Sequence, residues 1–557
     1  MRKVIGLLVL SLLLFWSCKV DIESSPIGSS SYEPGENEIV LISSKTFASQ
    51  VGDSEKIYVI RDTFDLGGQE VNIGKNSTLK FLGGSVKNGT VVFNNTKITG
   101  YPSFTACSYK GNLTNDEVDL DWFNFDLEGK TYKYKTIEVP MQDPAVFQQI
   151  LDCLKSGIQL NINKIYAINK PVKIQKKISL KGADRSEGIY ADRIVQNMEY
   201  GFFNCGTFNS LFIVESGGEI SVHGVSLVGY TSLYMGGSLW EKCYSNGSLL
   251  SAPVSSCGID VKEGGKIGEI HDSSFVAFTY GIRSNGGTIG YIRNSYFSLC
   301  RFGFWAKDTN DFELRGCRLN SNELNFHFYE KNLYYIANSP DNVPLKETDA
   351  DQIVKIGGGL YLNNCKNVSV TNCRFEFNYI QVMIDDSAEN VTIHNCIMDC
   401  ATLCHIAINN QGNPASSSST PAINNLTVSA CTLARGARCD IQNATSVPGF
   451  GIFYFCDIGD RGALINFKNI IVSDDMEVDK TIDVRYEDVV FDIYNKSSAN
   501  GTVLNLEGNS FYSSKATNIF NVVSGSSGSF KINACGNDYG DKTLISGVTS
   551  VLDLTEN

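Results

Sequence analysis

The feature that most constrains the fold is a short internal repeat in the middle of the chain. Six seven-residue segments align, and the first three begin 22 residues apart: EIHDSSF (269–275), YIRNSYF (291–297), ELRGCRL (313–319), SVTNCRF (369–375), TIHNCIM (392–398) and TVSACTL (427–433). A period near 22 residues is too short for a helical hairpin, and the pattern of leucine-rich repeats is missing. The short, alternating, β-branched stretches fit one coil of a parallel β-helix.

Two columns of this alignment support stacked coils. The first column holds residues suited to a tight bend, whose stacked side chains can hydrogen-bond neighbouring backbones: Asp272, Asn294, Asn372 and Asn395. The next column holds small residues that we expect to face inward at this corner: Ser273, Ser295, Cys317, Cys373, Cys396 and Cys431. Seventeen cysteines in an exported protein would ordinarily suggest disulfides. Their place in this column instead indicates buried free thiols, with occasional disulfides as the alternative.

The first seventeen residues read as a targeting segment. Arg2 and Lys3 precede an apolar run from Val4 to Phe15, which is too short for a permanent membrane span. The segment ends in Ser17-Cys18 and resembles the lipobox of bacterial lipoproteins, which implies lipid attachment at Cys18. The alternative is an ordinary secretory signal. Acidic residues after Cys18 resemble the surface-export signal of Bacteroidetes lipoproteins, so we expect an outer-membrane lipoprotein facing the periplasm or the cell surface.

The remaining chain divides into four expected parts. Residues 18–37 form a flexible tether, 38–115 a β-rich region, 116–165 a connector with a helix, and 166–557 the β-helix. Asp143-Pro144 is a helix start, and Gly157 follows an apolar stripe with helical spacing. We expect this helix to plug the open end of the solenoid, where core and strand edges would otherwise be exposed.

Several segments near this helix resemble the opening of pectate-lyase-superfamily β-helices, which tailspike-like phage proteins share. They are Asp121-Trp122-Phe123, the helix with Phe147-Gln148-Gln149, Ile165–Asn169 and Ile178–Gly182. The resemblance covers roughly residues 40–300 and implies an all-β, right-handed, single-stranded parallel β-helix. It implies little about activity, because the superfamily includes lyases, hydrolases, epimerases and non-catalytic binders.

One strand of each coil is expected to form a ligand-binding face. Alternation turns Ile259, Ile282, Phe304, Phe326, Val382 and Ile406 inward. The outward positions then form two columns, one with Asp260, Arg283, Trp305, His327, Met383 and Ala407, and one with Lys262, Asn285, Lys307, Tyr329, Asp385 and Asn409. Long insertions flank these strands and would wall a groove suited to an extended polymer. The resemblance points to the same face, since it carries the active site in the pectate-lyase superfamily.

The side chains of this face suggest chemistry on an acidic glycan. Trp305, Lys262, Gln381 and His405 are the candidate substrate-binding residues, because rings stack on sugars and cations pair with carboxylates. The candidate catalytic residues are His327, Tyr329, Arg283, Lys307 and Asp385. His327 or Tyr329 could take the proton beside a uronate carboxyl while a cation stabilises the developing charge, which is β-elimination.

A rival set of acidic residues follows three of these strands. Asp308, Glu330 and Asp386 would stack about 4.8 Å apart per coil. Such carboxylates could hold Ca²⁺, or a pair of them could serve as acid and base in glycoside hydrolysis. Ordinary solvated turn positions are the alternative.

Two classes of function stay open from the sequence. One is a polysaccharide lyase or glycoside hydrolase. The alternative is a non-catalytic glycan-binding or adhesive lipoprotein, which is supported by the missing zinc spacings, phosphate loops, nucleophile elbows and motifs of pectate lyases and polygalacturonases. A net charge of −13 argues against a nucleic-acid partner. The glycan, its linkage and the oligomeric state do not follow from the sequence.

Overall fold

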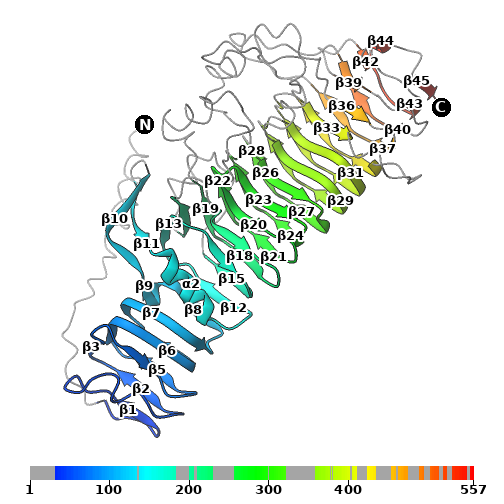
Figure 1. Ribbon diagram of the computed structural model, residues 1–557. Coiled ribbons are helices and arrows are strands. Elements are labelled where there is room, and N and C mark those ends of the chain that lie inside the picture. The colour runs from blue at the N-terminus through cyan, green and yellow to red at the C-terminus, as the bar shows by residue number, and fades with distance from the viewer. Residues whose placement is uncertain are drawn as a thin grey trace, which may run out of the picture.

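The computed structural model describes residues 32–134, 137–182, 200–205, 210–229, 256–298, 300, 302–320, 358–376, 378, 380–399, 401, 404–410, 423–434, 453–458, 462–473, 489–494, 502–512, 518–522, 530–547 and 552–556. Within these ranges the chain winds into an elongated stack of coils that runs from β1 at one end to the strands near the C-terminus at the other (Figure 1). Among the described residues, no helix is long and apolar enough to span a membrane.

The strands belong to an N-terminal group and three long, mainly parallel sheets. The N-terminal group contains β1 (Glu38–Val40), β2 (Ile57–Ile60), β3 (Thr63–Asp65), β4 (Glu70–Asn72), β5 (Thr78–Phe81), β6 (Ser85–Gly100), β7 (Phe104–Leu113) and β9 (Phe123–Asn124). Sheet 1 contains β14 (Val172–Ile174), β17 (Phe212–Val214), β20 (Cys257–Val261), β23 (Tyr280–Asn285), β26 (Phe302–Lys307), the first parts of β29 (Gly358–Thr371) and β31 (Ile380–His394), β33 (Cys404–Asn410), β36 (Phe453–Ile458), β39 (Val489–Tyr494), β42 (Asn518–Val522) and β44 (Thr543–Gly547).

Sheet 2 follows sheet 1 within each coil, and sheet 3 follows sheet 2. Sheet 2 contains β8 (Glu117–Asp119), β12 (Ile158–Asn161), β15 (Lys177–Lys181), β18 (Glu219–His223), β21 (Lys266–His271), β24 (Thr288–Arg293), β27 (Asn310–Arg315), the second parts of β29 and β31, β34 (Ile423–Ser429), β37 (Ala463–Lys468), β40 (Thr502–Glu507), β43 (Phe530–Cys535) and β45 (Leu552–Glu556). Sheet 3 contains β10 (Asp126–Tyr134), β11 (Ile137–Gln142), β13 (Ile165–Ile168), β16 (Gly201–Asn204), β19 (Ser226–Val228), β22 (Ser274–Val276), β25 (Tyr296–Ser298), β28 (Arg318–Asn320), β30 (Arg374–Glu376), β32 (Ile397–Asp399), β35 (Thr432–Ala434), β38 (Ile471–Ser473) and β41 (Ser510–Phe511).

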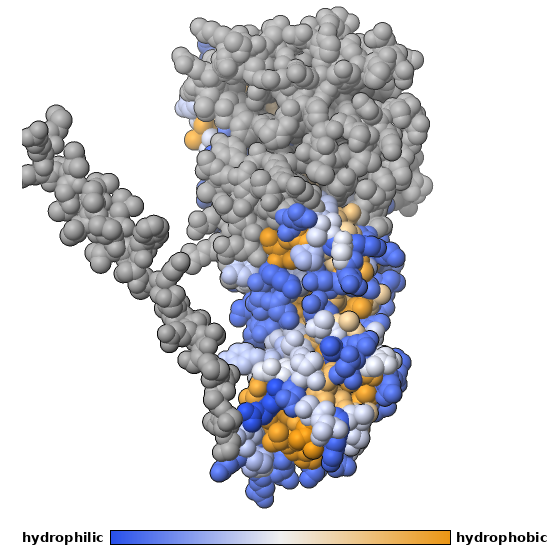
Figure 2. Space-filling view, turned by 90° about the vertical axis from the view of Figure 1, so that its left-hand side faces the viewer, coloured by the Kyte–Doolittle hydropathy of each residue, from blue (hydrophilic) through white to orange (hydrophobic). Residues whose placement is uncertain are grey.

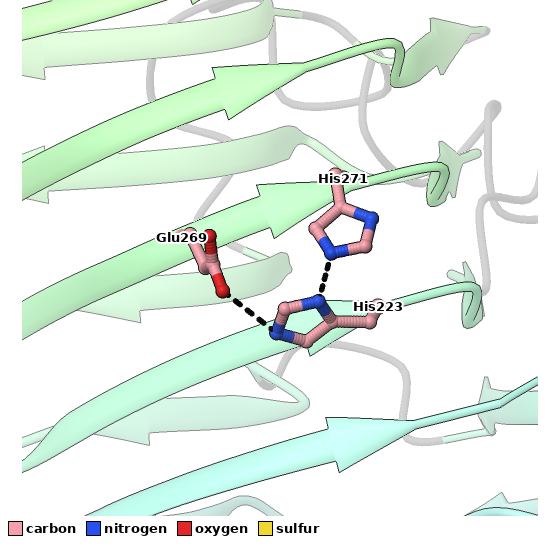
Figure 3. Close-up of side chains that lie close together, drawn as sticks. All are labelled: His223, Glu269 and His271. Atoms are coloured by element: carbon pink, nitrogen blue, oxygen red, sulfur yellow. Dashed lines mark hydrogen bonds and ion pairs between the residues drawn. The ribbon is translucent and has the colours of Figure 1, made fainter.

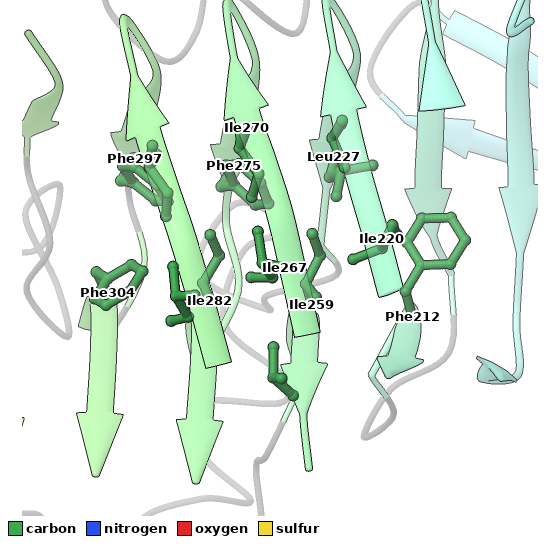
Figure 4. Close-up of a cluster of buried hydrophobic side chains, with 14 of the residues drawn as sticks. Phe212, Ile220, Leu227, Ile259, Ile267, Ile270, Phe275, Ile282, Phe297 and Phe304 are labelled. Carbon is green, nitrogen blue, oxygen red and sulfur yellow. The ribbon is translucent and has the colours of Figure 1, made fainter. Parts of the chain in front are cut away.

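The core lies between the three sheets and is built by the expected alternation. Phe212, Ile259, Ile282 and Phe304 are register partners along sheet 1, and all four are fully buried. They face residues of the other two sheets across the interior (Figure 4). Apolar residues from Leu41 to Ala534 form one continuous cluster. The N-terminal coils and the later coils therefore share a single hydrophobic core, which fixes the winding register of the whole stack.

The predicted bend between sheets 2 and 3 is confirmed. Asp272, Asn294, Asn372 and Asn395 all have positive φ, between 47° and 54°. This left-handed conformation suits asparagine and aspartate because their short side chains tolerate it best after glycine. Asn395 Nδ2 donates a hydrogen bond to Asn372 Oδ1 at 2.8 Å, as expected for an axial ladder.

A second asparagine ladder, which the sequence did not reveal, runs along the start of sheet 2. The Nδ2 group of Asn390 donates to Asn367 Oδ1 at 3.1 Å, and that of Asn425 donates to Asn390 Oδ1 at 3.1 Å. These residues also have positive φ. Both edges of sheet 2 are thus held in register by amide side chains along the axis.

The cysteine column is also confirmed. Cys317, Cys373, Cys396 and Cys431 are buried free thiols. Their Sγ atoms donate to backbone carbonyls of the preceding coil, for example from Cys373 to Leu314 at 3.6 Å. They therefore satisfy corner carbonyls in the same way as a serine at this position.

The predicted helix is α2 (Pro144–Cys153), preceded by a short 3₁₀ turn η1 (Leu120–Trp122). Asp143 Oδ1 accepts a hydrogen bond from the Ala145 N–H at 2.8 Å, and Phe147 and Ile150 point into the core. The cap and the apolar stripe are thus confirmed.

The expected position of α2 at an open end of the solenoid is wrong. The helix contacts β7 on one side and β14 on the other, because the N-terminal region is itself a set of stacked coils. Gln149 Oε1 accepts from the Tyr109 N–H at 3.0 Å, and Gln148 Oε1 accepts from the Lys173 N–H at 2.8 Å. These two glutamines supply hydrogen bonds that a neighbouring strand would otherwise make.

On the side of the N-terminal coils seen in Figure 2, the surface is mainly hydrophilic. Orange apolar groups interrupt the blue surface on the side shown in Figure 2. The exposed large apolar side chains of the described residues are scattered along the chain: Ile42, Leu82, Tyr101, Tyr291, Ile397, Ile471 and Tyr512. Scattered exposure of this kind is ordinary for a folded protein and does not by itself mark an interface.

Candidate functional site

The outward face of sheet 1 carries a row of charged and aromatic side chains in consecutive coils. Asp260, Arg283, Trp305 and Tyr361 are successive register partners on β20, β23, β26 and β29. Neighbouring parallel strands lie about 4.8 Å apart, so these side chains are neighbours along the solenoid axis. We call these four residues, together with Lys262, Tyr280, Lys307, Asn363 and Asp385, the sheet 1 row.

An ion-paired group forms one end of the row. Arg283 donates from Nε to Asp260 Oδ1 at 3.0 Å and from Nη2 to Oδ2 at 2.7 Å, and Lys262 Nζ lies 2.7 Å from Oδ2. The Asp260 side chain is only 3% exposed. Burial opposes its charge, but the hydrogen bonds from Arg283 and Lys262 hold the pKa of Asp260 below its ordinary value. The group therefore carries a net charge of about +1 at neutral pH.

Aromatic rings occupy the middle of the row. Trp305 and Tyr361 stack with centroids 5.5 Å apart and planes 4° from parallel. The Tyr280 ring meets Trp305 at 5.9 Å in an edge-on arrangement, and the Arg283 guanidinium lies 5.2 Å from the Tyr280 centroid. Trp305 thus stacks one face on Tyr361 and also contacts the Tyr280 ring, so only part of the indole is exposed to a ligand.

A tyrosine–carboxylate pair forms the other end. The Tyr361 hydroxyl donates to Asp385 Oδ2, and Asn363 Nδ2 lies 3.4 Å from the same oxygen. Burial and the nearby Asp385 charge raise the pKa of Tyr361, so its hydroxyl keeps its proton at neutral pH. The pair consists of a neutral donor and a carboxylate in adjacent coils.

The structure corrects the expected neighbour of Trp305. The sequence placed His327 and Tyr329 beside β26, but the register partners of Trp305 and Lys307 are Tyr361 and Asn363. Residues 321–357 lie outside the described residues, so His327, Tyr329 and Glu330 are not placed. One sequence signal for the correct strand was missed. A glycine directly precedes the first inward residue of the strand at Gly258, Gly281 and Gly359, whereas the strand predicted around His327 has asparagine at this position, residue 325.

This glycine column also explains why the outward assignment of Gln381 and His405 is wrong. A Cβ atom at Gly359 would lie 3.0 Å from the Phe375 ring, so the second position of these strands faces the interior where the chain turns from sheet 3 into sheet 1. Gln381 and His405 occupy this column in later coils and are fully buried. Buried side chains cannot contact a polysaccharide.

Their surroundings are those of core polar residues. Gln381 donates from Nε2 to the Asp399 carbonyl at 2.7 Å. Neither ring nitrogen of His405 has a hydrogen-bond partner in the described structure. Burial lowers the pKa of His405 to about 4, although the nearby Asp399 charge acts in the opposite direction.

The expected stack of carboxylates for Ca²⁺ is not formed by Asp308 and Asp386. The coil of Asn364 lies between them, and Asn364 donates to Asp308 Oδ1 at 2.6 Å. Ser387, in place of Asp386, continues this ladder by donating to Asn364 Oδ1 at 2.9 Å. These turn residues are thus occupied with axial hydrogen bonds, and the described geometry does not fit a calcium site.

The remaining predicted residues lie in the sheet 1 row. Lys262, Arg283, Trp305, Lys307 and Asp385 all lie in its two outward columns, as alternation predicted. Cys18 lies outside the described residues. The sequence reasoning did not select Asp260, Tyr280, Tyr361 or Asn363. Asp260 was visible in the column next to Arg283, and an acidic residue one coil from an arginine indicates an ion pair.

Comparison with known families now identifies the fold. A family model described as "Right handed beta helix region" matches residues 244–397. The chain is a right-handed parallel β-helix. The fold implied by the pectate-lyase resemblance is therefore confirmed.

Several solved structures are similar to this chain at low identity. DFA-IIIase from Arthrobacter chlorophenolicus A6, without its lid, is 11% identical with a TM-score of 0.46, and the match covers 73% of this chain and 89% of that one. The catalytic unit of a GH87 α-1,3-glucanase from Streptomyces thermodiastaticus is 12% identical with a TM-score of 0.37, covering 73% and 64%. An alginate lyase from Paenibacillus is 11% identical with a TM-score of 0.27, covering 74% and 97%. No curated protein matches the chain.

Proposed function

We propose that this protein is an exported lipoprotein that binds an acidic polysaccharide along the sheet 1 row. The observation that carries the proposal is the succession of Asp260–Arg283, Trp305, Tyr361 and Asp385 in consecutive coils on one face. A polymer lying along the solenoid axis would meet a cation, aromatic edges and a carboxylate in turn. Export and lipid attachment at Cys18 belong to the proposal and rest on the sequence of the first eighteen residues.

The basic end supports an acidic ligand in particular. Asp260 engages Nε and Nη2 of Arg283, which leaves the Nη1 donors for a carboxylate or sulfate. Lys262 is about half exposed, and Lys307 is exposed two coils further along. Because Asp260 orients the guanidinium before any ligand arrives, little side-chain entropy is lost on binding.

Neutralising the two exposed lysines should weaken binding selectively. We expect a Lys262→Gln/Lys307→Gln variant to bind an acidic polysaccharide about 10- to 100-fold more weakly, since a hydrogen bond to a charged group contributes about 1.5–3 kcal/mol. Affinity gel electrophoresis on a panel of acidic and neutral polysaccharides measures this. The matched control is Arg315→Gln/Lys531→Gln, which removes two exposed cations from sheet 2. Equal retention of both variants would reject the sheet 1 row as the binding face.

Catalysis at Tyr361 and Asp385 is a second candidate function. The hydrogen bond between them favours it, because it joins a protonated donor, the largely buried Tyr361, to the partly exposed carboxylate of Asp385. Asp260 is four coils from Asp385, about 19 Å at 4.8 Å per step. Glycosidase carboxylates lie about 5–10 Å apart, so these two cannot form such a pair. Elimination needs only one base and an acid for the leaving oxygen, which Asp385 and Tyr361 supply.

The catalytic candidate has its own test. If the wild-type protein converts an acidic polysaccharide to unsaturated uronates, Asp385→Asn and Tyr361→Phe should each lower kcat by about 10²- to 10⁴-fold. Retention on affinity gels should change little, because neither substitution removes a cation. Absence of products from every glycan that the wild type retains would reject catalysis and leave the binding function.

A further inference from the structure

Two histidines and a glutamate meet on the outward face of sheet 2, away from the sheet 1 row. His223 and His271 are register partners on β18 and β21, and Glu269 lies two residues before His271. His223 Nδ1 faces His271 Nε2, and His223 Nε2 lies 3.4 Å from Glu269 Oε1 (Figure 3). One ligand atom from each residue lies within 4.8 Å of the other two.

A β-bulge brings Glu269 to this position. Ile220 pairs with Ile267 and Val222 with Ile270, so β21 has one residue more than β18 between these pairs. The extra residue lies beside Gly268, where a Cβ atom would come within 2.6 Å of Ser221 Oγ. Bulges re-aim side chains, and this one directs Glu269 toward His223 of the preceding coil.

The neighbouring groups outside the cluster contact the atoms of His271 and Glu269 that point away from His223. Asp272 Oδ2 lies 3.0 Å from His271 Nδ1, which places the proton there and the lone pair on Nε2. The Tyr291 hydroxyl donates to Glu269 Oε2 at 2.7 Å and leaves Oε1 toward His223. Hydrogen bonds of this kind typically orient metal ligands from behind.

Charges around the cluster are balanced and do not expel a cation. Lys181 and Arg293 are the register partners on either side of the two histidines. Glu269 and Asp272 offset them, and the Arg293 guanidinium lies 5.5 Å from the Tyr291 ring centroid. The histidine and glutamate side chains are 19% to 35% exposed, so an ion could enter from solvent.

We propose that His223, Glu269 and His271 bind a divalent transition-metal cation of the Zn²⁺ type. Two imidazoles and a carboxylate are ligands that zinc accepts, at about 2.0–2.2 Å from the ion. Two ligand atoms on the same ion are at most about 4 Å apart. The ligand atoms of the cluster already lie within 4.8 Å of one another, so small side-chain rotations are enough to place them around one ion. Three protein ligands leave a further coordination position, which water or an incoming ligand atom completes.

Calorimetric titration of the chelator-treated full chain with Zn²⁺ tests the site. We expect one equivalent to bind in the wild type, with affinity lowered more than about 100-fold in His223→Gln and in His271→Gln, since loss of even an outer partner costs about 10- to 100-fold. Asp272→Asn, which changes such an outer partner, should lower the zinc affinity by about 10- to 100-fold. His394→Gln is the matched control, because His394 lies in the same outward column of sheet 2 with Ser429 as its partner.

Every variant keeps all the cysteines, so zinc held by thiols would persist unchanged in all of them. Circular dichroism verifies folding, and Asp272→Asn keeps the test decisive if a histidine variant does not fold. The proposal would be overturned if the zinc affinity and stoichiometry were the same in the wild type, in Asp272→Asn and in every histidine variant that folds. Absence of zinc binding to the wild type would overturn it as well.

Discussion

Replacing Asp260 with alanine is expected to lower the free energy of unfolding by about 3 kcal/mol. The Asp260 side chain is 3% exposed and pairs with two cations, of which Arg283 is only 23% exposed. Without the carboxylate, Arg283 stays in a largely desolvated position with no counter-charge. Lys262 should contribute little to the loss, because it is half exposed and can return to water.

A second substitution distinguishes an unpaired charge from lost packing. Asp260→Ala/Arg283→Met removes both charges, so it should be more stable than Asp260→Ala alone. Urea denaturation of the four proteins in this double-mutant cycle measures the effect. A double variant as unstable as Asp260→Ala would mean that the ion pair is not the reason for the loss. The double variant should also lose polysaccharide retention, since Arg283 supplies the Nη1 donors.

The fold was predictable because the bends of its coils recur at regular intervals and are occupied by residue types that tolerate the required backbone conformation. Asparagine and aspartate at positive φ mark one bend in several coils, as Asn294 and Asn372 show, while Gly316 and Ala430 occupy the same bend in two others. Between bends, strict alternation decides which side chains are buried, and this placed Arg283 and Trp305 outside and Ile282 and Phe304 inside. Regular local rules repeated along the chain give a register that a sequence can reveal.

The candidate site was only partly predictable because it depends on places where the repeat is interrupted. After Asn320 the next described strand begins at Gly358, and nothing in a 22-residue period says which residue resumes the stack. The strand chosen around His327 had the right pattern, but Gly359 and Tyr361 occupy the neighbouring coil. Alternation also fails at corners. Gln381 and His405 lie an even number of residues from the positions predicted to face outward, yet both side chains are buried.

The histidine cluster of sheet 2 shows a third limit. His223 and His271 are 48 residues apart in sequence because an insertion separates their coils. His271 lies in a column with Arg293 and Arg315, a pattern that in the sequence indicates no more than a charged surface. The bulge that directs Glu269 toward His223 adds a single residue to β21. In the sequence, only the glycine at 268 indicates that a bulge could form there. Contacts between coils of unequal length therefore cannot be predicted from the repeat alone.

Acidification should destabilise the protein through His405, by up to about 3 kcal/mol between pH 6.5 and 4. In the unfolded chain this histidine gains a proton as the pH falls through about 6.5. In the folded chain, burial keeps it neutral until the pH approaches about 4. The unfolded state thus binds more protons between these values, so stability is full above pH 6.5 and decreases as the pH falls.

A His405→Gln variant isolates this contribution from the carboxylates that also titrate in acid. Gln381 occupies the same column one coil earlier and donates to a backbone carbonyl, so glutamine is compatible with this corner. We expect urea midpoints of the wild type to fall more steeply than those of His405→Gln from pH 7 to pH 4. His394→Gln, which changes an exposed histidine, should follow the wild type. Parallel pH profiles for wild type and His405→Gln would show that the buried imidazole does not couple folding to protons.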